Sequence, residues 1–126
     1  MSKKTKWFLT FLYMILLVYF SLKGRGPVAH TSTIKEMMHN LGHIPAYAVL
    51  TYLLVWSFST IQRAILMRVF LISFFYGVGM EILQSFTPDR TPSVKDALLN
   101  ALGAGVMLWL LKRGYLRISY SILTDV

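Results

Sequence analysis

Two strongly apolar segments of this chain each carry a pair of polar side chains. Glu81 and Gln84 lie on the first segment, and Asp96 and Asn100 open the second. Spacings of three and four residues put side chains on one face of a helix, so each segment presents a polar stripe. Burying such groups among apolar residues is costly unless they are hydrogen-bonded or paired. The four side chains are therefore candidates for binding a polar group or for general acid–base chemistry.

The connection between the two stripes adds a cation and a hydroxyl group. Arg90 and Ser93 lie there, and Ser93 stands three residues before Asp96, as in a helix-capping box. An arginine held by carboxylates still has donors to offer an anion. Two roles remain for Ser93: capping the start of the helix, and contacting a ligand. Two roles remain for Arg90: an ion pair with Glu81 or Asp96, and the binding of an anion.

Two histidines, His39 and His43, lie four residues apart, and Tyr47 follows four residues later. This spacing favours one helical face, although Pro45 interrupts the register. The pattern is not His-Glu-x-x-His and has no third ligand at a fixed spacing, which disfavours a zinc site. We expect no metal and no cofactor. His43 is expected to hydrogen-bond within a cluster of the polar residues.

The composition is that of a membrane protein. Of the 126 residues, 56% are hydrophobic and 14% are charged, whereas soluble domains have roughly 45–50% and 25%. The net charge is +8, but its cations form short clusters between apolar runs. Nucleic-acid binding is therefore excluded, because it calls for a basic face or stripe. The absence of cysteine excludes disulfides and cysteine nucleophiles.

Four uncharged or nearly uncharged runs are long enough to cross a bilayer. Each spans roughly 23–27 Å as a helix, which suffices for a hydrocarbon core of about 30 Å when flanking side chains snorkel. The runs cover residues 7–22, 44–61, 69–86 and 97–111. We expect an all-α integral membrane bundle of four transmembrane helices, forming one domain over residues 1–126.

A short interfacial helix is expected before the second span. Thr33 followed three residues later by Glu36 fits a capping box, and predicts a helix to about Gly42 at the membrane surface. Pro45 has no amide hydrogen, so we expect it in the first turn of the second span rather than inside a helix.

The charges flanking the runs predict how the chain crosses the membrane. The first run is longer than a usual signal-peptide core, and Gly24-Arg25-Gly26 is a poor cleavage site, so a retained helix is expected. Lys and Arg are more numerous in the segments that an inside N-terminus would keep inside. Both termini are therefore predicted to be cytoplasmic, and the polar stripes then lie near the outer face.

The polar residues resemble the pattern of the VanZ-like family. The resemblance rests on Gly79-Met80-Glu81-Ile82-Leu83-Gln84 on a membrane helix, followed by Arg90, Ser93, Asp96, Asn100 and Gly103. His43 followed by Tyr47 is similar to a further element of that family, and the resemblance covers about residues 40–111. His39 and Asn40 stand where family members often carry an Asp-Lys pair.

The resemblance implies a small membrane protein linked to glycopeptide resistance, chiefly to teicoplanin. We expect it to bind or modulate an anionic lipid or a lipid-linked cell-wall precursor at the outer membrane face, and an oligomer stays open. The expected pocket is formed by His43, Glu81, Gln84, Arg90, Ser93, Asp96 and Asn100.

Two other interpretations of the same residues stay open. A membrane-embedded lipid hydrolase or transferase could use Glu81, Asp96, His43 and Arg90, although no nucleophile with an adjacent base is evident. The polar groups could also serve only to hold the helices together.

Overall fold

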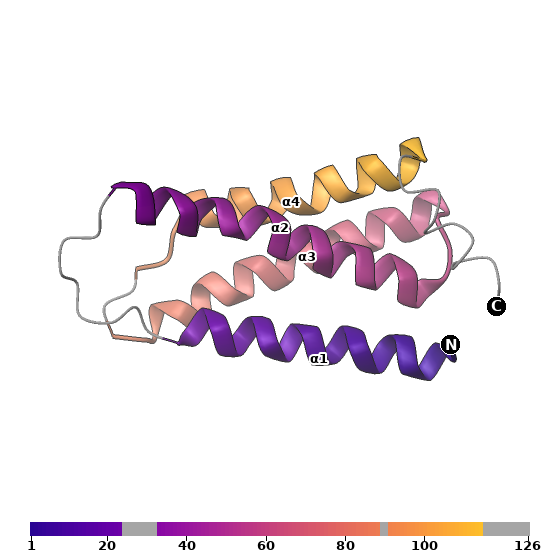
Figure 1. Ribbon diagram of the computed structural model, residues 1–126, viewed down its shortest axis with the longest axis horizontal. Helices are drawn as coiled ribbons and strands as arrows, with labels where there is room; N and C mark the ends of the chain where they lie inside the picture. The colour runs from indigo at the N-terminus through magenta and orange to yellow at the C-terminus, as the bar shows by residue number, and fades with distance from the viewer. Residues whose placement is uncertain (24–32, 89–90, 115–126) are drawn as a thin grey trace.

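The structure is a computed structural model that describes residues 1–23, 33–88 and 91–114. These residues form four helices and no strand: α1 (Lys3–Leu22), α2 (Thr33–Phe58), α3 (Arg63–Ser85) and α4 (Val94–Arg113). Each helix contains a stretch that is long and apolar enough to cross a membrane. The predicted all-α bundle of four spans is thus confirmed (Figure 1).

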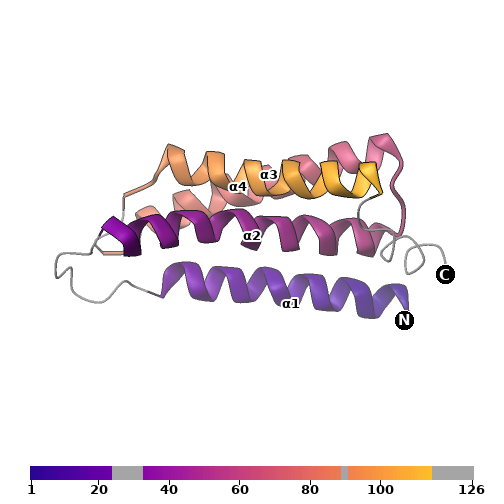
Figure 2. The same ribbon diagram turned by 45° about the horizontal axis from the view of Figure 1, so that its top comes forward.

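The four helices lie side by side along the long axis of the molecule (Figures 1 and 2). α1 and α4 each contact α2 and α3. α1 ends, α2 begins, α3 ends and α4 begins at one end of the bundle, which we call the loop end. The opposite end, which we call the N-terminal end, holds the start of α1, the α2–α3 connection and the end of α4.

The core of the bundle is small and centres on α2. Leu50, Leu54 and Val55 of α2 are buried together with Val69 of α3 and Leu111 of α4. Many large apolar side chains point outward instead, among them Phe8, Ile15, Phe75 and Trp109. An apolar surface of this extent marks an interaction surface in a soluble protein, and faces lipid in a membrane helix.

Hydrogen bonds attach α1 to the other helices. Lys6, which the charge pattern put outside the first span, is buried, and its Nζ donates to Ser59 Oγ at 3.0 Å. Thr10 and Ser57 share a hydroxyl–hydroxyl bond of 2.8 Å, and the Tyr13 hydroxyl donates to the Ala46 carbonyl. Interhelical hydrogen bonds of this kind join helices where the lipid is as apolar as the side chains.

The start of α2 differs from the prediction. α2 runs from Thr33 through Pro45 to Phe58 without a break, so the expected short interfacial helix is the first part of the second helix. The placement of Pro45 in the first turn of a helix was wrong. A membrane helix tolerates an internal proline when neighbouring helices pack against it, and α4 packs against the α2 backbone at Ile44, one residue away.

Candidate functional site

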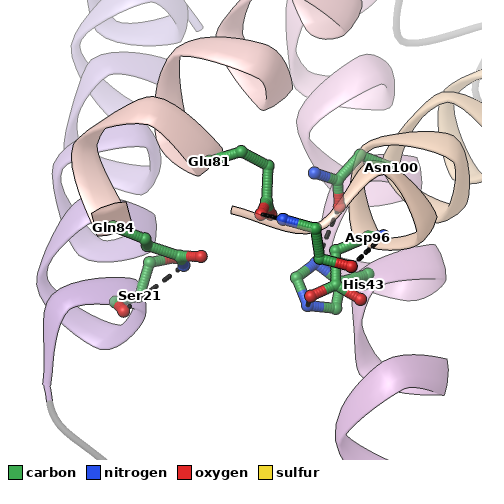
Figure 3. Close-up of polar contacts among 7 residues, drawn as sticks. Ser21, His43, Glu81, Gln84, Asp96 and Asn100 are labelled. Atoms are coloured by element: carbon green, nitrogen blue, oxygen red, sulfur yellow. Dashed lines mark hydrogen bonds and ion pairs between the residues drawn. The ribbon is translucent and has the colours of Figure 1, made fainter. Parts of the chain in front are cut away.

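His43 joins α2 to α4 at the loop end. Its Nδ1 lies 2.8 Å from Asn100 Oδ1, and its Nε2 lies 3.8 Å from Asp96 Oδ2 (Figure 3). Because a carbonyl oxygen only accepts, Nδ1 carries the hydrogen in this bond. Asn100 is 2% exposed. Asp96 and Asn100 stand one turn apart, so the spacing of four residues brings both to the imidazole, as the helical period requires.

Glu81 joins α3 to the first turn of α4. Its carboxylate is buried, and Oε2 accepts the Ser93 backbone N–H at 3.0 Å. Ser93 in turn is the N-cap of α4, because its Oγ accepts the Asp96 backbone N–H at 3.2 Å. The positive end of the α4 dipole favours carboxylates at this place. The helix cap considered for Ser93 is therefore present, and a carboxylate from another helix supports it.

One oxygen of the Glu81 carboxylate is left over. Oε1 is buried and has no hydrogen-bond partner among the residues that the structure describes. Buried polar atoms are nearly always hydrogen-bonded, so an exception asks for an explanation. Oε1 therefore keeps an acceptor site that the described residues leave unfilled.

Glycines make room for this arrangement at two points. A Cβ at Gly77 would lie 3.1 Å from Asn100 Nδ2, so the absence of a side chain leaves space for the buried amide. A Cβ at Gly103 would overlap the Ile44 carbonyl oxygen, which shows how closely α4 approaches α2. A Cβ at Gly79 or Gly105, by contrast, would meet nothing within 4 Å. Gly77 and Gly103 thus lie where another helix packs closely, and Gly79 and Gly105 do not.

Gln84 shares a helix with Glu81 but turns toward a different neighbour. Its Nε2 donates to the Ser21 carbonyl of α1 at 3.4 Å, away from the His43 group (Figure 3). The sequence pattern missed Ser21 because its backbone oxygen, not its side chain, makes the contact. Glu81 and Gln84, which the sequence placed on one polar stripe, therefore contact different neighbours: Glu81 contacts the start of α4, and Gln84 contacts α1.

A pocket of about 270 Å³ opens between α1, α2 and α3 at this end. Its polar lining includes His43 and Gln84, and its apolar lining includes Leu17, Phe20 and Met38. His43 thus belongs both to the pocket and to the polar cluster, by which we mean His43, Glu81, Ser93, Asp96 and Asn100.

The predicted site residues fall into three groups. Five form the polar cluster, Gln84 lies apart from it on the pocket wall, and Arg90 lies outside the described residues. The side chain of His39 is also outside the description. Within the described ranges, no three His, Asp or Glu side chains gather as metal ligands would. The geometry offers hydrogen-bond donors and acceptors beside an apolar pocket.

We expect Ser93→Ala to lower the free energy of unfolding by about 1 kcal/mol, the usual cost of losing an N-cap. Ser93→Thr keeps the hydroxyl and should lose less. Thr91→Ala, at an exposed position of the same connection, is the control. Equilibrium unfolding in detergent, followed by circular dichroism, measures all three. Equal stability of the Ser93→Ala and Thr91→Ala variants would contradict the cap.

A family model described as VanZ/LLP1 matches residues 6–117. The chain belongs to the VanZ-like family. The matched range takes in α1 as well as the residues on which the sequence resemblance was seen. No curated protein and no solved structure matches this VanZ-like chain at a significant level. Family membership and the four apolar helices together make it a multi-pass membrane protein.

Proposed function

We propose that this VanZ-like protein binds the polar head group of an anionic lipid or lipid-linked cell-envelope precursor at the loop end, on the outer membrane face. Binding there contributes to teicoplanin resistance. The proposal rests on the double position of His43, which hydrogen-bonds within the buried polar cluster and also lines the pocket. If these residues only held the helices together, His43 would not need to line a pocket.

The pocket suits the head of an amphiphile better than a whole lipid. At about 270 Å³ it is slightly smaller than typical ligand pockets, which hold about 300–1,000 Å³. Phe20 and Met38 line it and are largely exposed, so an alkyl chain can continue along α1 and α2. His43 and Gln84 then provide the polar contacts.

The charges around the loop end are compatible with an anionic head group. The Glu81 carboxylate accepts the Ser93 N–H, and the Asp96 carboxylate lies 3.8 Å from His43 Nε2, a contact that is an ion pair only when the imidazole is protonated. Lys95 is exposed beside them, and Arg90 lies in the same connection of the chain. These two cations are the groups we assign to a phosphate.

Binding is favoured over covalent catalysis by the position of Ser93. Its hydroxyl oxygen caps the helix by accepting from the Asp96 N–H, and among the described residues no base accepts the hydroxyl proton, as a serine nucleophile would need. Ser93 is thereby assigned to holding the site together.

The test is drug susceptibility in a susceptible Gram-positive host. Wild type should raise the teicoplanin concentration needed to stop growth several-fold over empty vector, with little change for vancomycin. His43→Ala and Arg90→Ala should lose this protection at matched membrane levels. Arg68→Ala, an exposed arginine at the other end of α3, is the matched control and should keep it.

Two results would count against the proposal. Wild type that is present in the membrane but gives no protection would separate this protein from resistance. Protection that survives both His43→Ala and Arg90→Ala would separate resistance from the loop end.

A further inference from the structure

A groove runs between α3 and α4 on the surface, beginning at the N-terminal end. Its first part has a volume of about 410 Å³ and is lined by Leu66, Phe70, Leu108 and Trp109, with Arg63 and Lys112 at its mouth. It lies at the opposite end of the bundle from the polar cluster (Figure 1). None of its residues belongs to the candidate site.

The groove continues along α4 past the middle of the bundle to the second turn of that helix. A second hollow of about 530 Å³ shares Phe70 and Trp109 with the first and extends to Leu98. The step from Leu98 to Lys112 corresponds to about 21 Å of helix, and one leaflet of the hydrocarbon core is about 15 Å thick. Gly105 lines this part, and a Cβ there would meet nothing within 4 Å. The groove is therefore long and open enough for one acyl chain.

The mouth of the groove is positively charged. Arg63 is the first residue of α3, Lys112 lies in the last turn of α4, and both side chains are exposed. The chain carries no Asp or Glu between residues 63 and 80 or between 97 and 124. Neither helix therefore supplies a carboxylate near the mouth, and two cations from different helices face the same opening.

The start of α3 adds backbone donors at the same place. Its first turn holds no acidic residue, and the N-cap residue, Gln62, makes no side-chain cap bond within the described part of the chain. The N–H groups at a helix start favour an anion. A cation such as Arg63 is unfavourable there by itself, and an anion beside it relieves this repulsion.

We propose that this groove binds an anionic phospholipid, with its phosphate between Arg63, Lys112 and the start of α3. One acyl chain lies along Phe70, Leu102 and Val106. Trp109 lies beside that chain, and Arg113 packs over the Trp109 ring at 5.8 Å from the centroid. The site is independent of the proposed function, because it uses other residues and its charged mouth lies at the other end of the molecule.

Trp109 gives a direct readout of the bound chain. The protein has three tryptophans, so Trp7→Phe with Trp56→Phe leaves Trp109 as the single fluorophore in the full-length chain. This form is reconstituted into phosphatidylcholine vesicles that contain a small fraction of acyl-brominated phosphatidylglycerol or, in parallel, of acyl-brominated phosphatidylcholine. We expect brominated phosphatidylglycerol to quench Trp109 several-fold more effectively at equal mole fraction.

Variants distinguish a built site from general surface charge. Arg63→Gln with Lys112→Gln should abolish the preference for phosphatidylglycerol. Lys3→Gln with Lys4→Gln makes the same change of charge at exposed positions of the same end and should keep it. Gly105→Leu should weaken quenching by both brominated lipids because its side chain occupies the groove. Circular dichroism confirms that each variant is helical.

Three outcomes would overturn the proposal. The first is equal quenching by the two brominated lipids. The second is a preference that persists in the Arg63/Lys112 variant. The third is an equal loss in the Lys3/Lys4 variant, which would assign the preference to surface charge alone.

Discussion

Gly103→Ala is expected to destabilise the bundle by about 3 kcal/mol or more, at or above the usual cost of overpacking a core. The added methyl group would overlap the carbonyl oxygen of Ile44. A backbone atom cannot move aside as the end of a flexible side chain can, so α2 and α4 must separate. Separation also pulls His43 on α2 from Asn100 on α4, and the proposed binding should fail with it.

Gly105→Ala is the matched control for this experiment. It makes the same substitution two residues along the same helix, where a Cβ meets nothing within 4 Å. Alanine is a better helix former than glycine by about 1 kcal/mol, so this variant should be as stable as wild type or slightly more so. Thermal unfolding in detergent compares the two. Equal stability of the two variants would mean that the close approach of α2 and α4 is wrong.

Glu81→Ala should have the second largest effect, a loss of about 2–3 kcal/mol. The substitution removes the charge-assisted hydrogen bond from the Ser93 N–H, and such bonds contribute about 1.5–3 kcal/mol. It also leaves a buried void where the side chain was. Because Ser93 caps the start of α4, the position of Asp96 and Asn100 depends on the same contact. Teicoplanin protection should disappear together with the stability.

Glu81→Gln separates the hydrogen bond from the charge. Its amide oxygen can still accept the Ser93 N–H, so unfolding in detergent should show a clearly smaller loss than for Glu81→Ala. Ser85→Ala, at an exposed position of the same helix, should change stability little. If Glu81→Ala were as stable as Ser85→Ala, the carboxylate would not hold the start of α4.

Both expectations follow from the overlap of the candidate site with the packing of the helices. Asn100 fills the space left by Gly77 and bonds to His43, and Glu81 supports the first turn of α4. The groups that could recognise a ligand are thus also those that orient α4 against α2 and α3. Activity and stability must be measured together for every variant in this cluster.

Several features could be predicted from the amino-acid sequence. Apolar runs of membrane length predicted four helices, since a bilayer leaves backbone groups little other way to be satisfied. The spacing of Asp96 and Asn100 predicted that they share a face, and Ser93 three residues before Asp96 predicted the cap of α4. These are local properties, determined by the helical period and by the hydrogen bonds of the first turn.

Only the tertiary structure decided which groups meet across helices. It brought His43 to Asn100, turned Gln84 to a backbone carbonyl of α1, and carried α2 through Pro45. It also gave two nearby glycines different surroundings: Gly103 packs against α2, and Gly105 lines the open groove. The rotation and closeness of packed helices decide such contacts, because the same polar stripe can face any neighbour. Those quantities depend on all four helices together and are absent from the spacing of residues in any one of them.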